Sequence, residues 1–180
     1  AYAQFRVMQL AKGTVTVTLE GQGADEQLAG YHYFFGLYYK ELLFKFHFGK
    51  LIKEIIANYQ KHRSLFALKT FVFFLLPKKL RTKLRVSEKG YLNPLFNEQH
   101  SKYSEIAGNI YGSSNLKEAL IDHFEYKMEH HLKWGDFNSM WHSIESRMPF
   151  LDHRLVEKTI SLPSEQIIQN GSTKFILREA

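Results

Sequence analysis

The sequence VTLEGQGADEQLAGY at residues 17–31 joins three local structural signals in a short space. The alternating, β-branched run at residues 14–19 predicts a strand, which leads directly into the glycine-containing loop at residues 21–26. A helix is favoured from Gln27 onward. Before the strand, residues 2–10 carry apolar side chains at helical spacing and end in a lysine–glycine pair, which predicts another helix. This order of elements indicates an α/β unit.

The loop at residues 21–26 is a candidate ligand site, because ligands of open α/β sheets bind at the carboxyl ends of the strands. Gly21 and Gly23 would let the backbone approach a phosphate closely. Asp25 and Glu26 would repel a bare phosphate, so a cation such as Mg²⁺ is expected between the two. The alternative is a tight turn in which both acids complement the dipole of the next helix. Spacing alone favours this alternative.

The positive charge of the chain is concentrated in its middle. Residues 40–89 hold 13 Lys or Arg and three Asp or Glu, whereas the formal net charge of the whole chain is +6. Residues 40–59 and 65–76 are predicted to be helical, and the second run indicates a buried helix that is too short to span a bilayer. The basic run that follows favours a solvated helix face, with contact to anionic lipid as the alternative; it comprises Lys78, Lys79, Arg81, Lys83 and Arg85. Nucleic acid is not expected as a partner, because no binding motif accompanies the charge.

The remaining third of the chain predicts helices separated by a polar stretch. We expect an amphipathic helix over residues 116–132, an irregular stretch over 134–149 and a helix over 151–162. Asn170 and Gly171 predict a turn, and Ser172 is expected to cap a last helix. The chain thus divides into residues 1–31, an aromatic and basic helical segment at 32–110, and residues 111–180.

Several kinds of chemistry are excluded by composition and spacing. The chain has no Cys, so it holds no disulfide, thiol nucleophile or cysteine-ligated metal, which fits a reducing, cytoplasmic compartment. None of its nine His falls in a zinc-binding helical pattern, and no serine lies in a hydrolase nucleophile turn. The sequence begins without Met in an apolar run, and we expect it to be a piece of a longer polypeptide.

Two stretches resemble the C-terminal synthetase domain of glutamine-dependent asparagine synthases. They are residues 17–31 and the run SMWHSIESRMPFLDHRLVEKTISLPSEQIIQNGSTKFILREA at residues 139–180. Residues 32–110 show no such resemblance. The resemblance implies an α/β fold that is part of a Rossmann-like ATP-pyrophosphatase domain, related to the adenine nucleotide alpha hydrolases and mostly helical in this fragment.

The resemblance also implies a carbon–nitrogen ligase reaction. ATP and Mg²⁺ would activate a carboxylate as an acyl-adenylate, which ammonia converts to an amide. The ammonia would come from glutamine, through a glutaminase domain expected upstream in the same chain. An S-G-G-x-D-S pyrophosphate loop is expected upstream too, so the fragment alone is expected to be inactive. A module of the same fold that binds anionic lipid or a lipid-linked glycan without catalysis is the alternative.

Residue roles follow by position in the motifs. Asp25 matches the carboxylate that holds Mg²⁺ and pyrophosphate, and Glu26 beside it is expected to support the loop. Lys174 matches the lysine that contacts phosphate oxygens during adenylation. Arg178, one turn later in the same ending, is expected to bind the nucleotide by neutralising phosphate charge, and Glu179 matches that ending too. The run that contains Glu145, Arg147 and Asp152 is expected to be chiefly structural.

Gln22 departs from the family pattern, since asparagine synthases typically carry Glu at this place. A neutral amide cannot act as a general base. The carboxylate substrate is therefore expected to be either aspartate or another acid, such as a sugar acid of bacterial surface polysaccharides.

Overall fold

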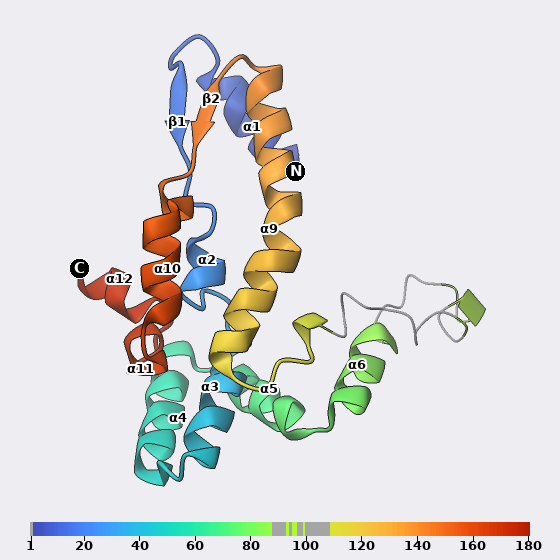
Figure 1. Cartoon of the computed structure of the whole chain (residues 1–180), viewed down its shortest axis with the longest axis vertical. Coiled ribbons are helices and arrows are strands. Elements are labelled where there is room, and N and C mark those ends of the chain that lie inside the picture. The colour runs from blue at the N-terminus through green and yellow to red at the C-terminus, as the bar shows by residue number, and fades with distance from the viewer. Residues whose placement is uncertain (1, 88–92, 94, 97–98, 100–108) are drawn as a thin grey trace.

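A computed structural model of the chain describes residues 2–87, 93, 95–96, 99 and 109–180. In these ranges the chain is mostly helical with one small sheet (Figure 1). The strands are β1 (Val17–Leu19) and β2 (Glu145–Arg147), and Pro149–Leu151 form the 3₁₀ turn η2. The helices are α1 (Tyr2–Ala11), α2 (Ala24–Gln27), α3 (Phe34–Phe44), α4 (Phe48–His62), α5 (Phe66–Leu75), α6 (Lys78–Ser87), α9 (Leu116–Trp141), α10 (His153–Ser161), α11 (Ser164–Ile167) and α12 (Phe175–Glu179).

The sheet consists of β1 and β2, which pair in parallel although they lie near opposite ends of the chain. Val17 pairs with Glu145 and Leu19 with Arg147. The amide of Glu20 continues the ladder by donating to the carbonyl of Arg147 at 2.8 Å. The strand predicted at residues 14–19 is confirmed over its second half. The parallel pair agrees with the expected α/β class, but the sheet in the described residues has only these two strands and so corresponds at most to a part of the expected Rossmann-like sheet.

The core is built around the first part of α3, residues 34–39, which are apolar on all sides and buried between other elements. Phe34, Phe35, Tyr38 and Tyr39 are essentially inaccessible to solvent. They pack with apolar residues of α4, α5, the start of α9, and Ile167 and Ile168. Gly36 allows α3 and α5 to approach closely, because a Cβ atom at this position would lie 2.5 Å from the backbone of Thr70.

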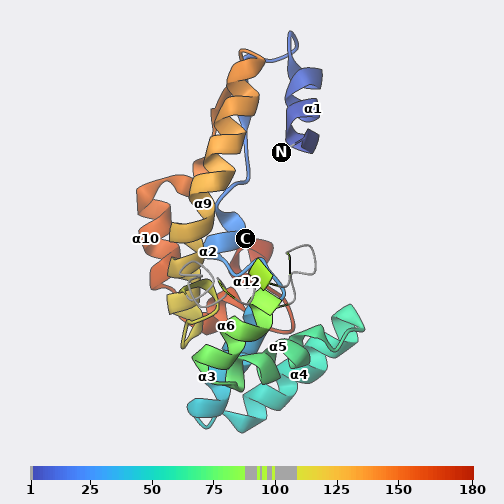
Figure 2. The ribbon, with the colours of Figure 1, turned by 90° about the vertical axis from the view of Figure 1, so that its right-hand side faces the viewer.

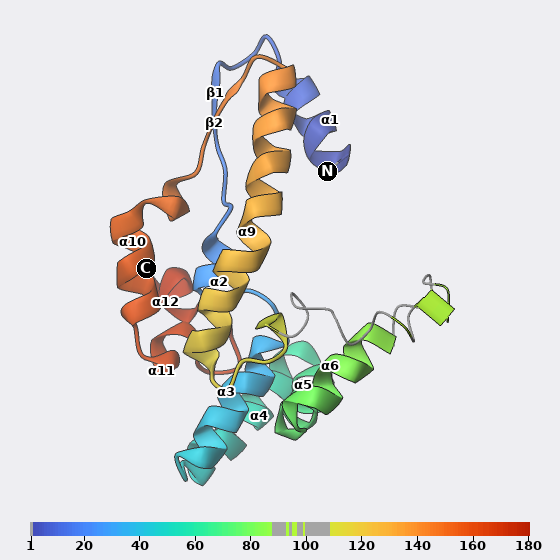
Figure 3. The ribbon, with the colours of Figure 1, turned by 45° about the vertical axis from the view of Figure 1, so that its right-hand side comes forward.

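Helix α9 lies along the long axis of the molecule and runs from the core to the sheet (Figures 1 and 3). The prediction that this helix ends near residue 132 is wrong, because it continues to Trp141 through Gly135. Gly135 is buried in the helix, and a Cβ atom there would lie 3.2 Å from Cε of Met148 and 3.3 Å from Nε2 of Gln4. This glycine lets α1 and β2 pack closely against α9 rather than ending the helix.

The middle segment differs from its predicted helices in two ways. The run at residues 40–59 is divided between α3 and α4 by a break after Phe44. The run at 65–76 forms α5, which is only half buried, since Leu68, Val72 and Leu75 are exposed. No helix in the described part of the chain combines the length and apolar character needed to cross a bilayer. Most of residues 88–108, which belong to the predicted segment 32–110, lie outside the described residues.

The basic run at residues 78–85 predicts a solvated helix face, and this prediction is wrong for Arg81. Its side chain is 4% exposed and donates to the carbonyls of Ser113 at 3.2 Å and Gly112 at 3.5 Å. The guanidinium also lies over the ring of Phe74, 5.5 Å from its centre. Arg81 therefore fastens α6 to the segment before α9, whereas Lys78 and Lys79 are exposed.

The C-terminal elements pack beside α9 and α2 (Figure 2). Asp152 caps α10 by accepting from the amide of Arg154 at 2.9 Å, which is a structural role. The predicted cap at Ser172 is wrong, because the residue before α12 is Lys174 and no side chain caps this helix. Ser172 instead forms a backbone bridge with Gln169, which closes the turn at Asn170 and Gly171.

Candidate functional site

The two stretches at residues 17–31 and 139–180 lie against each other. Beyond the strand pairing, the hydroxyl of Ser146 donates to the carboxylate of Glu20 at 2.6 Å. The buried amide of Gln27 donates to the carbonyl of Phe150 at 2.5 Å and accepts from the hydroxyl of Thr159 at 2.7 Å. These side-chain hydrogen bonds fix the glycine loop against η2 and α10.

The glycines of the loop have different roles. Gly23 has a φ of +93°, and a Cβ atom there would lie 2.4 Å from Cδ2 of Leu151, so this position requires glycine. Gly21 is exposed and has open space around it. The helix that follows, α2, is a single turn, so its dipole contributes little to anion binding. Phosphate contacts of Gly21 and Gly23 therefore stay predictions.

Asp25 and Lys174, which are both expected to act in the same reaction, form an ion pair. Nζ of Lys174 lies 2.6 Å from Oδ1 of Asp25, and the two side chains are 24% and 45% exposed, respectively. Lys174 adopts a left-handed conformation with a φ of 51°, and its amide donates to the carbonyl of Leu28 at 3.0 Å. The backbone thus directs the lysine toward the loop, and the pair presents both charges at a solvent-accessible place.

Gly30 is part of this geometry and was missed by the sequence analysis. A Cβ atom at Gly30 would lie 1.6 Å from Oδ1 of Asp25 and 2.7 Å from Cε of Lys174. Its amide also donates to the carbonyl of Asp25 at 2.8 Å. The ion pair therefore occupies space that any larger residue at position 30 would fill. Its place in the GQGADEQLAGY run was the only signal in the sequence.

A polar pocket of about 290 Å³ opens next to Asp25. It collects side chains from α1, the glycine loop, α2, the segment after α2, and α9, namely Gln4, Gln22, Asp25, Glu26, Tyr31, His131 and Trp134. The structure thus brings Gln22, Asp25 and Glu26 together. It adds Gln4, His131 and Trp134, which no sequence motif marked, because they come from helices whose faces are defined only by packing.

Glu26 is buried and supports the loop from the inside. Its side chain is 2% exposed and accepts a hydrogen bond from the hydroxyl of Tyr31 at 2.5 Å. Nδ1 of His131 lies 3.9 Å from the same carboxylate oxygen. Burial, followed by the hydrogen bond to Glu26, raises the pKa of Tyr31 above its ordinary value, so the hydroxyl remains a donor at neutral pH. This arrangement agrees with the supporting role expected for Glu26.

His123 lies behind Tyr31 and is a buried neutral histidine. Its ring contacts the rings of Tyr31, Tyr33 and Phe34. Nδ1 lies 2.7 Å from the carbonyl of Ala119 and therefore carries the proton, whereas Nε2 has no hydrogen-bond partner among the described residues. Burial, and after it a nearby lysine, lowers the pKa of His123 to about 3.

The stability of the protein is therefore expected to fall in acid through His123. Its side chain takes up a proton below about pH 6.5 in the unfolded chain but only near pH 3 in the folded chain, as its folded pKa of about 3 indicates. The contribution of His123 to the free energy of unfolding is thus fully present above pH 6.5, and it falls by about 1.4 kcal/mol for each pH unit below that value. Urea unfolding at pH 7.5, 6.5 and 5.5 measures this dependence. His123→Leu should flatten it and His153→Gln, at an exposed histidine, should not; equal slopes for wild type and His123→Leu would contradict the assignment.

The other predicted residues lie outside the pocket lining. Nε of Arg178 donates to the carbonyl of Thr173 at 2.9 Å, so the structure places it as a support for the turn before Lys174. Its predicted phosphate contact remains untested. Glu145 and Arg147 form an exposed ion pair at 2.7 Å on β2, and Asp152 binds Arg154. The hydrogen bond from Arg154 lowers the pKa of Asp152 below its usual range.

The residues present suit Mg²⁺ that arrives with a nucleotide. Among the described residues, no three His, Asp or Glu side chains gather into a metal site. Mg²⁺ is usually held by one or two carboxylates together with phosphate oxygens, so a complete protein cage is not required. Asp25 offers such a carboxylate, because its side chain is 45% exposed and faces a polar pocket. Lys174 beside it would bind the phosphates that accompany the metal.

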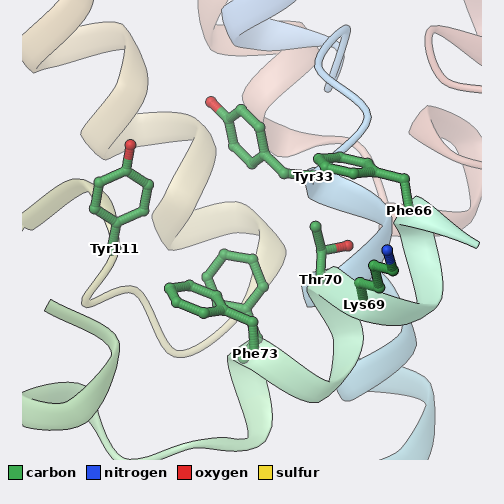
Figure 4. Close-up of a pocket in the computed structure, with 7 residues that line it drawn as sticks. Tyr33, Phe66, Lys69, Thr70, Phe73 and Tyr111 are labelled. Atoms are coloured by element: carbon green, nitrogen blue, oxygen red, sulfur yellow. The ribbon is translucent and has the colours of Figure 1, made fainter. Parts of the chain in front are cut away.

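A second, aromatic pocket of about 280 Å³ lies between α3, α5 and the segment before α9 (Figure 4). Its lining includes Tyr33, Phe73 and Tyr111, with Thr70 and Lys69 as polar neighbours. The ring of Tyr33 stacks on that of Tyr31, with centres 5.6 Å apart, so the stacked pair separates this pocket from the polar one. None of the residues assigned to catalysis lines it.

The comparisons with known proteins agree with the joined motifs. A family model described as Asparagine synthase matches residues 1–180. The chain belongs to the asparagine synthase family. Among curated proteins it is similar to asparagine synthetase (glutamine-hydrolyzing) 1 of Bacillus subtilis (strain 168), with 26% identity over 203 aligned residues that cover 97% of this chain and 29% of the relative. The chain therefore spans less than a third of that relative's length. No solved structure matches it.

The match to the asparagine synthase family extends beyond the resemblance seen in the sequence. It includes residues 32–110, which carry no recognisable motif, together with both motif stretches. The physical reason is visible in the fold, since α3 and α4 hold the core against which the loops at residues 21–31 and 169–174 are placed. The positions of such helices are set by packing, which a short motif does not record.

Proposed function

We propose that this chain is the ATP-binding C-terminal part of a glutamine-dependent amidotransferase. The enzyme would activate a carboxylate as its acyl-adenylate, with release of pyrophosphate. Ammonia freed by a glutaminase domain elsewhere in the longer protein would then attack the adenylate and release AMP. The observation that carries this proposal is the 2.6 Å contact between Asp25 and Lys174 in a member of the asparagine synthase family.

The chemistry asks the protein to position ATP and to neutralise charge that develops on the leaving pyrophosphate. Lys174 is suited to the second task, because its ammonium is held at one place by a fixed backbone and an acidic partner. Asp25 would hold Mg²⁺, which shields the phosphates when it is bound. Glu26 and Tyr31 keep the loop in position from the buried side.

The substrate is proposed to be aspartate or a sugar acid. Gln22 lines the polar pocket next to Asp25 and Glu26, where a carboxylate substrate and ammonia would meet. Its amide can donate and accept hydrogen bonds but cannot remove a proton. This favours a reaction in which Gln22 orients the adenylate, and proton removal from ammonia falls to water or another group.

The products of the full-length protein test this proposal. Incubated with ATP, Mg²⁺, glutamine and either aspartate or a uronic acid, it should release AMP and pyrophosphate in equal amounts with the amide. The acid that supports this release identifies the substrate class. Omission of the carboxylate is the control and should stop AMP release. ADP and inorganic phosphate as products would reject the acyl-adenylate.

A further inference from the structure

A carboxylate far from both motifs is buried under the turn that leads to Lys174. Glu54 lies on α4 and is 2% exposed. Its Oε1 atom accepts from the amide of Asn170 at 2.9 Å, and its Oε2 atom accepts from the amide of Gly171 at 3.0 Å. Tyr39 of α3 fixes the same position by donating to the carbonyl of Glu54 at 3.3 Å. Both oxygens of this carboxylate are thus used to hold a turn of the second motif.

The turn has no room to move on α4. Asn170 and Gly171 have left-handed φ values of 50° and 66°, and a Cβ atom on Gly171 would lie 2.5 Å from the amide nitrogen of Asn58. The ring of His62 contacts the carbonyl of Gly171 at 3.0 Å, and Lys61 donates to the hydroxyl of Ser172. The backbone of the turn therefore rests directly on the C-terminal half of α4.

The turn fixes the backbone position from which the side chain of Lys174 extends. Thr173 is buried, and the next residue, Lys174, is tied to the glycine-loop side by the hydrogen bond of its amide to Leu28. The lysine is thus held between two fixed points, the carbonyl of Leu28 and the turn bound by Glu54. A shift of the turn would move Nζ away from Asp25, which it contacts at 2.6 Å.

We propose that Glu54 is a positioning residue that holds Lys174 against Asp25. The structural part of this inference, that Glu54 holds the turn, rests on the hydrogen bonds. Its catalytic part, that the turn places Lys174 for the reaction, rests on the proposed function. The substitution Glu54→Gln would keep the volume of the side chain. It would replace one carboxylate oxygen, which accepts a hydrogen bond, by an NH₂ group that faces a backbone amide donor. The turn would lose a hydrogen bond to a charged group, which is among the stronger kinds.

The experiment compares Glu54→Gln with Glu41→Gln in the full-length protein. Glu41 lies on α3 and binds Lys45 and Ser164, without contact to the turn. Amide hydrogen exchange over residues 168–178 should be roughly tenfold faster in Glu54→Gln and unchanged in Glu41→Gln. The turnover number of ATP–pyrophosphate exchange should fall roughly tenfold with an unchanged KM for ATP. Gly171→Ala, which displaces the turn without altering Glu54, should reproduce both effects.

The two measurements separate the inference from the function on which it rests. Unchanged hydrogen exchange in Glu54→Gln would overturn the structural part, whatever the activity. Faster hydrogen exchange with a wild-type turnover number would overturn the positioning role. Wild-type protein without any ATP–pyrophosphate exchange would reject the proposed function, and hydrogen exchange would still decide whether Glu54 holds the turn.

Discussion

Replacement of Lys174 by Ala, or of Asp25 by Asn, is expected to lower ATP–pyrophosphate exchange by the full-length protein by about 10²- to 10³-fold. Each change removes one charge from the pair whose atoms lie 2.6 Å apart. Lys174→Ala removes the ammonium that would stabilise the departing pyrophosphate, so the turnover number should fall more than the KM for ATP rises. Asp25→Asn removes the carboxylate that would hold Mg²⁺, so excess Mg²⁺ should restore part of its activity.

The same substitutions should leave the fold nearly unchanged, since partly exposed ion pairs contribute only about 0–1 kcal/mol. Thermal unfolding then distinguishes loss of chemistry from loss of structure. The matched controls are Lys133→Ala and Asp136→Asn, which make the same chemical changes at exposed positions of α9. Both controls should retain wild-type exchange. Wild-type exchange by Lys174→Ala or Asp25→Asn would remove these residues from the site.

Gly30→Ala is expected to lower the exchange rate by about 10²-fold, although it removes no charged side chain. Its new methyl group would meet Oδ1 of Asp25 at 1.6 Å and Cε of Lys174 at 2.7 Å. The carboxylate must rotate away, and the ion pair opens. The crowded groups are partly exposed and can move. The free energy of unfolding should therefore be lower than in the wild type by about 1–3 kcal/mol at most.

Gly49→Ala is the control for this substitution. Gly49 lies in the first turn of α4, and a Cβ atom there meets nothing within 4 Å. Alanine is a better helix former than glycine, so this variant should be as active as the wild type and slightly more stable. Exchange kinetics and thermal unfolding of the two variants, measured side by side, provide the comparison. A fully active Gly30→Ala protein would show that the close contact at Gly30 is unimportant for the reaction.

The sequence predicts much of the candidate site because its key residues lie in short, ordered runs. Asp25 and Gln22 follow a β-branched strand, and Lys174 lies in a run that resembles the same family. The structure joins these runs through β1 and β2 and through the side chain of Gln27. The family resemblance of these runs thus singled out the residues, whereas only the fold shows that Lys174 contacts Asp25.

Other features could not be predicted, because local pattern is ambiguous where tertiary packing decides. Gly135 falls in the stretch predicted to be irregular but lies inside α9, where it admits Gln4 and Met148. Ser172 has the composition of a helix cap, but its backbone is used in the turn with Gln169. Glu54 reads as one surface acid among many lysines, and its burial depends on a turn more than a hundred residues further along the chain.

The parallel pairing of β1 and β2 also implies an order of folding. The entropic cost of closing a loop rises with its length, and contacts between distant residues slow folding. The packing of α3 with α5 closes a short loop, whereas the two strands must meet across most of the chain. We therefore expect α3 and α5 to pack first, and we expect both the strand pairing and the still longer-range contact of Asp25 with Lys174 to form later. A chain trapped before that step would have a packed interior and no site.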